Sequence, residues 1–106
     1  MKQVLNKIEF KLQVNPKGDI ISEEVFDSIK KFDLAQFDKI EINLSNVKKI
    51  DVQFILSLLS LYKDTRENGP VVSILDPSEQ AAGMLSYYGV KYITAINKSE
   101  ATEKTL

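Results

Sequence analysis

The polar side chains that could carry chemistry in this sequence gather in one region: Ser45, Lys48, Lys49, Asp51, Ser57 and Ser60. Asp51 could act as a general base, but a catalytic site needs several groups in a shared arrangement. The chain has no His and no Cys, which excludes imidazole bases, thiol nucleophiles and the usual zinc sites. Its four glycines are isolated and form no phosphate-binding loop. We therefore expect no enzyme activity, no metal and no cofactor.

An anion site is the chemical alternative for the same region. Lys48 and Lys49 precede the expected start of a helix, where free backbone N–H groups favour anions. A phosphate or nucleotide could then bind at the loop expected over residues 45–50. Lysines are mostly exposed, so two solvated side chains in a loop are the commoner explanation. Sensing of a small ligand or nucleotide is kept as an alternative function.

A long helix from Asp51 to Gly69 is predicted to organise the fold. Asp is a preferred N-cap because its carboxylate accepts a hydrogen bond from a free N–H of the first turn, and Asn68–Gly69 is a stop signal. Almost every residue up to Tyr62 outside one narrow polar stripe is apolar. The stripe consists of Gln53, Ser57, Ser60, Asp64 and Glu67. We therefore expect this helix to be mostly covered, by its own domain or by a partner.

The segments around this helix predict an α/β fold. Alternating apolar residues indicate strands within 4–14 and over 39–44, and apolar runs indicate strands at 71–75 and 92–96. Helices are expected over 22–33, capped by Ser22, and over 77–88, with Asp76-Pro-Ser-Glu79 as a capping box. A turn over 15–19 would close a hairpin and make the sheet mixed. We expect one domain over 1–106 with four to five strands, helices mainly on one face, and a polar tail or short helix over 98–106.

From Ile40 to Ile96 the sequence resembles a STAS domain, the fold of bacterial anti-sigma factor antagonists. The shared pattern is a strand, a loop, Asp51 and a long apolar helix, followed by GPVVSILDPSEQAAGMLSYYGV with Leu85 and Gly89 at the family's later Leu and Gly. The resemblance implies a non-catalytic module for protein–protein interaction in signal transduction or transcription regulation. It implies a kinase-like anti-sigma factor, a sensory complex or a transporter as the partner.

The sequence departs from this family at the phosphorylation site. Val52 stands where the family has the phosphorylated Ser, and Phe54 stands where it has Gly. Valine has no hydroxyl, so the family's phosphate switch is predicted to be absent. Ser45 is the candidate substitute phosphosite, although Ser45–Asn46 is also typical of a plain turn.

The predicted partner-binding residues surround the start of the long helix: Ser45, Asn46, Asp51, Val52, Gln53, Phe54, Ser57 and Leu61. Phe54 is the open case. If it is exposed, it forms an apolar contact patch with Val52 and Leu61. An aromatic residue at helical spacing more commonly serves the core.

The whole chain gives few other functional signals. A net charge of −1 indicates no nucleic-acid binding. No apolar run is long enough to cross a membrane, and the first residues lack a signal-peptide pattern. We expect a cytoplasmic protein without membrane insertion, as a monomer or weak dimer.

Overall fold

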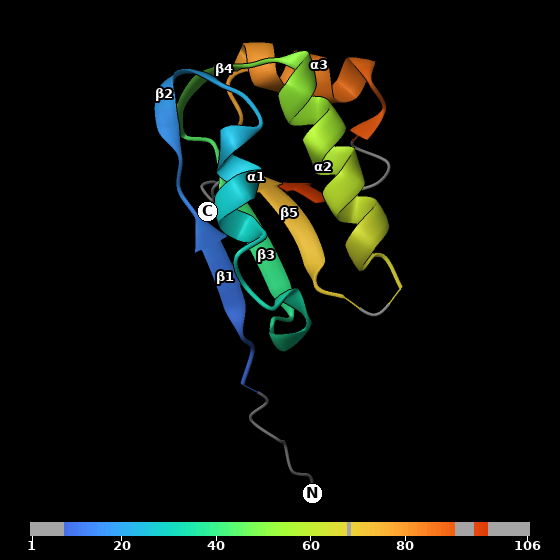
Figure 1. Cartoon of the computed structure of the whole chain (residues 1–106). Coiled ribbons are helices and arrows are strands. Elements are labelled where there is room, and N and C mark those ends of the chain that lie inside the picture. The colour runs from blue at the N-terminus through green and yellow to red at the C-terminus, as the bar shows by residue number, and fades with distance from the viewer. Residues whose placement is uncertain (1–7, 68, 91–94, 98–106) are drawn as a thin grey trace, which may run out of the picture.

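The computed structural model describes residues 8–67, 69–90 and 95–97 and shows a small α/β fold (Figure 1). The elements follow in chain order: β1 (Lys11–Val14), β2 (Lys17–Ile21), α1 (Glu24–Ile29), a 3₁₀ turn (Leu34–Gln36), β3 (Lys39–Asn43), β4 (Asn46–Ile50), α2 (Val52–Thr65), β5 (Val71–Leu75), α3 (Glu79–Tyr87) and β6 (Ala95–Asn97). Four strands form a sheet in the order β1-β3-β5-β6, and β2 pairs with β4. The predicted segments at 1–7, 91–94 and 98–106 lie outside the described residues.

Every strand pairing in the described residues is parallel, so the prediction of a mixed sheet with an initial hairpin is wrong. After Val14 the chain does not reverse. It continues past Pro16 into β2, while β3 continues into β4, so the same two chain segments pair twice (Figure 1). Proline has no N–H to give to a ladder, and Gly18 has φ 151°, so the Pro–Gly signal marks an interruption in a continuing strand.

The segment before α2 is the strand β4, and the prediction of a loop over 45–50 is wrong. Its burial pattern is strand-like only in part: Val47 and Ile50 are buried, while Lys48 and Lys49 are both exposed. What holds it extended is its pairing with β2, in which Ile50 lies opposite Ile21.

The helix limits follow local capping. The prediction that Asp51 caps α2 is confirmed, since its Oδ1 accepts a 2.9 Å hydrogen bond from the Phe54 N–H. The helix ends earlier than expected, at Thr65. Two other predicted caps are wrong: α1 has Glu23 at its N-cap without a side-chain bond, and α3 is capped by Ser78, whose Oγ accepts from Ala81 N–H.

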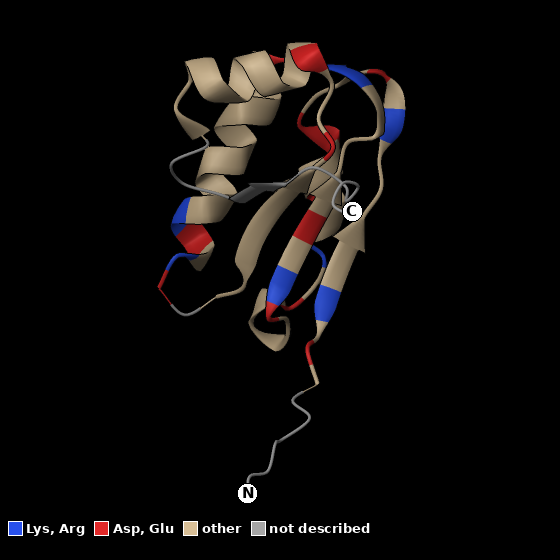
Figure 2. Cartoon of the chain, turned by 180° about the vertical axis from the view of Figure 1, so that it is seen from behind, with Lys and Arg blue, Asp and Glu red and all other residues tan. Residues whose placement is uncertain are grey.

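The core lies between the sheet and the helices. α1 and α2 lie against the face of the sheet that is turned to the viewer in Figure 1, where Ile40, Ile42 and Ile74 are fully buried. The opposite face carries charge, visible in Figure 2. There Glu41 forms ion pairs of 3.4 Å with Lys11 and 3.3 Å with Lys39.

Candidate protein-interaction surface

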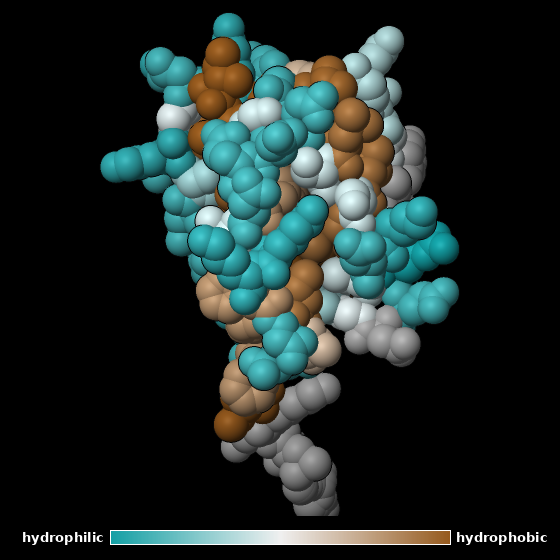
Figure 3. All heavy atoms as spheres, in the orientation of Figure 1, coloured by the Kyte–Doolittle hydropathy of each residue, from teal (hydrophilic) through white to brown (hydrophobic). Residues whose placement is uncertain are grey.

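The side of α2 that faces away from the core carries an outer stripe of four exposed residues: Val52, Gln53, Leu56 and Ser60. Val52 is 42% exposed and Leu56 is 53% exposed, one helical turn apart. The buried side of the helix fills the core with Phe54, Ile55, Leu58, Leu61 and Thr65. Figure 3 shows brown, apolar surface over the upper half of α2. The helix therefore has an ordinary buried face and an unusual apolar outer side.

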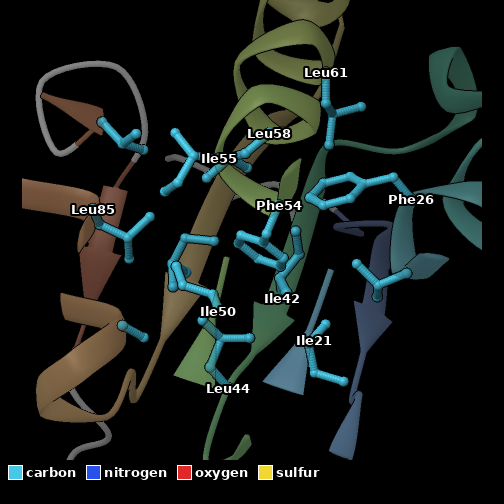
Figure 4. Close-up of a cluster of buried hydrophobic side chains, with 14 of the residues drawn as sticks. Ile21, Phe26, Ile42, Leu44, Ile50, Phe54, Ile55, Leu58, Leu61 and Leu85 are labelled. Atoms are coloured by element: carbon cyan, nitrogen blue, oxygen red, sulfur yellow. The ribbon is translucent and has the colours of Figure 1, made fainter. Parts of the chain in front are cut away.

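Two residues predicted for the partner surface belong to the core. Phe54 is 0% exposed and Leu61 is 2% exposed, so neither can contact a partner in this structure. The Phe54 ring lies 5.1 Å from that of Phe26 in an edge-on arrangement, and Figure 4 shows it pointing into the apolar cluster. The contact-patch interpretation of Phe54 is therefore wrong and its core interpretation is right. Phe54, Leu58 and Leu61 share one helix face through their 4- and 3-residue spacing.

The structure also divides the predicted site. Ser45 and Asn46 lie at the start of β4, and Asp51 follows its end. Six residue steps at about 3.3 Å place Ser45 up to about 20 Å from Asp51. The Val47 N–H donates to the Leu44 carbonyl at 3.0 Å across Ser45 and Asn46, which is the turn that the sequence also allowed. Ser45 and Asn46 are exposed, but the rest of β4 separates them along the chain from the outer stripe, which begins at Val52.

The remaining predicted residues stay near the start of α2. Val52 and Gln53 are exposed members of the outer stripe, whereas Asp51 and Ser57 are half-buried. Asp51 uses its carboxylate to cap the helix, so the group that could have been a base already has a structural role. Within the described residues no group of His, Cys, Asp or Glu side chains could hold a metal ion.

Gln80 is a positioning residue that sequence reasoning missed. Its Nε2 donates to the Ile50 carbonyl at 3.1 Å, and its Oε1 accepts from the Ile50 N–H at 2.9 Å. Beside it, Ser78 Oγ donates to the Lys48 carbonyl at 2.7 Å. These bonds fasten the start of α3 to β4, directly before the residue that caps α2. They therefore fix where the outer stripe begins.

A cavity of about 460 Å³ lies at the opposite end of α2 and contains none of the predicted site residues. It is lined by Leu34, Ala35, residues 63–67, Gly69 and Pro70. None of the helices in the described part of the chain has the length and apolarity that a membrane crossing requires.

Comparison with known proteins adds no relative. Neither a scan against models of protein families nor a search of curated proteins finds a match to this chain. The STAS resemblance therefore stays a prediction that depends on the sequence pattern alone.

Proposed function

We propose that this chain is a non-catalytic regulatory domain that binds a protein partner through the outer stripe of α2. One observation carries the proposal: Val52 and Leu56 are exposed on a helix whose other side already completes the core. Two exposed apolar side chains one helical turn apart form a patch, and a contiguous apolar patch marks a contact surface, whereas single exposed apolar side chains are ordinary.

The charge distribution along α2 agrees with an interface. No charged residue occurs from Val52 to Tyr62, although 27% of the whole chain is charged. Depletion of charge is what distinguishes the centre of a protein interface from the rest of a protein surface. Gln53 and Ser60 add neutral polar groups that can form hydrogen bonds with a partner.

The kind of partner follows from the STAS resemblance. A kinase-like anti-sigma factor, a sensory complex or a transporter would bind the stripe, and the protein would act in the cytoplasm in signalling or transcription control. Binding would be constitutive at the helix start, because Val52 has no hydroxyl to phosphorylate and Ser57 is half-buried within a regular helix. The exposed Ser45 remains the candidate phosphosite, at the far end of β4.

The alternative function, sensing of a small ligand or nucleotide, depended on a binding loop over residues 45–50. Residues 46–50 are a paired strand, and the Asp51 carboxylate occupies the N-terminus of α2, where it repels an added anion. We therefore favour protein binding.

Photo-crosslinking in the native host tests the proposal. A photoreactive amino acid at position 56 should give a covalent adduct with a partner protein. The same amino acid at position 20 is the matched control, because Ile20 is 61% exposed but lies on β2, away from α2 (Figure 1). Equal adduct yields at the two positions, or none at position 56, would contradict the proposal.

A further inference from the structure

The outer edge of β1 is open in the described part of the chain. β1 is the first strand in the sheet order and pairs there only with β3. The Phe10 carbonyl accepts hydrogen bonds from Asp38 N–H at 2.7 Å and Lys39 N–H at 3.3 Å, so the Phe10 backbone faces β3. Backbone groups of alternate residues along a strand point to opposite sides. The N–H and C=O groups of Lys11 and Gln13 in β1 therefore point outward, where another strand can bind them.

Exposed apolar side chains accompany this edge. Ile8 is 71% exposed and Phe10 is 58% exposed. Phe10 also lines an open cavity of about 370 Å³ together with Gln36 and Phe37. An unpaired edge with uncovered apolar side chains is a template for a further strand.

We propose that a second copy of this chain occupies the edge, with residues 8–12 of the two copies antiparallel about a two-fold axis at Phe10, the residue directly before β1. In this register Glu9 lies opposite the partner subunit's Lys11, and Lys11 lies opposite the partner subunit's Glu9. Ile8 lies opposite the partner subunit's Leu12. Phe10 meets the partner subunit's Phe10 on the axis, which covers the exposed ring. The interface is isologous and joins the two sheets into one.

Charge selects this register from its neighbours. Moving the axis by one residue in either direction, to Glu9 or to Lys11, places two like charges directly opposite each other. Of the axes at Glu9, Phe10, Lys11 and Leu12, only the axis at Phe10 pairs opposite charges, and it does so twice. Opposite charges across a strand pair are favourable, whereas like charges are not. The dimer leaves the outer stripe of α2 uncovered, because β1 and α2 lie on opposite sides of the fold (Figure 1).

A disulfide at the axis tests the geometry directly. The chain has no cysteine, so a single Phe10→Cys substitution reports on one contact only. Facing residues of a non-hydrogen-bonded antiparallel pair have Cα atoms about 4.5 Å apart, within the range that a disulfide spans. Under mild oxidation the variant should form a covalent dimer at least about tenfold faster than Ile20→Cys, which is equally exposed but on β2. Equal rates for the two variants would overturn the proposal.

A charge reversal tests the register in the chain with its Phe10 intact. Sedimentation equilibrium of the 12.0 kDa protein should show a dimer whose population rises with concentration. Glu9→Lys turns two attractive pairs into two repulsive ones and should raise the dimer dissociation constant about tenfold. Glu67→Lys makes the same charge change at an exposed position after α2 and should leave that constant unchanged. A native chain that remains monomeric at millimolar concentration, or equal weakening by both reversals, would overturn the proposal and leave the edge to a strand of another protein.

Discussion

The two hydrogen bonds between Gln80 and the Ile50 backbone should stabilise the fold by about 1–3 kcal/mol, because each intramolecular hydrogen bond contributes about 0.5–1.5 kcal/mol net. Both bonds have good length, at 2.9 and 3.1 Å, and both are partly shielded from water. Gln80→Ala removes both and leaves the N–H and C=O of Ile50 without these partners. Alanine is the slightly better helix former, which offsets only a few tenths of a kcal/mol.

Equilibrium unfolding in urea measures this loss. Small proteins lose about 1–3 kcal/mol of unfolding free energy per molar urea, so the midpoint should fall by about 1 M. Gln80→Glu should show about half the loss, since a carboxylate still accepts from the Ile50 N–H but cannot donate to its carbonyl. Ser86→Ala is the matched control, as an exposed residue of α3, with an expected change within about 0.5 kcal/mol. A midpoint for Gln80→Ala equal to that of Ser86→Ala would refute the clamp between α3 and β4.

Three further substitutions test the packing of α2 and its neighbours by the same unfolding assay. Phe54→Ala should cost about 3–5 kcal/mol, because the side chain is fully buried against Phe26, and a loss below about 1 kcal/mol would contradict its core position. Gly69→Ala should destabilise the fold, because its Cβ would lie 2.8 Å from backbone atoms of Thr65. Gly83→Ala meets nothing within 4 Å and should stabilise α3 by about 0.5–1 kcal/mol. A Gly69→Ala variant that is more stable than the Gly83→Ala variant would contradict these surroundings of the two glycines.

Local signals in the sequence predicted the elements that local forces determine. Asp51 was identified as the cap of α2 because its capping bond spans only three residues. The strand at Val71–Leu75 was predicted over the same residues, since a short apolar run between two proline signals has little alternative. In α3, Ala81 and Leu85 are buried, whereas Tyr88 directly after the helix is 43% exposed. The residues at a helix end are fixed by what packs beyond them.

The elements that the sequence missed depend on distant partners. β4 was predicted as the loop after the strand over 39–44. Its adjacent exposed residues Lys48 and Lys49 give it no regular alternation, and it is held by pairing with β2. The anchoring role of Gln80 was not visible because Ile50 lies 30 residues earlier in the chain.

Phe54 shows a different difficulty. The helical wheel placed the polar stripe correctly enough to include Gln53, but it could not say which neighbouring side faces the sheet. Phe54 follows Gln53 directly and lies about 100° further around the helix, since a turn takes 3.6 residues. This side is buried because Phe26 of α1 and the core residues of the sheet pack against Phe54, and the sequence of α2 alone does not show these contacts.

The affinity of a purified partner for two exposed-site variants tests the proposed function most directly. Leu56→Asp places a charge in the outer stripe and should weaken binding at least about thirtyfold, the loss of a contact worth about 2 kcal/mol. Ile20→Asp makes the same chemical change on β2, at a side chain of similar exposure, and should change the dissociation constant less than about threefold. Both variants should keep the native circular dichroism spectrum, because neither side chain is part of the core. Equal affinity of Leu56→Asp and the native chain for the partner would contradict binding through α2.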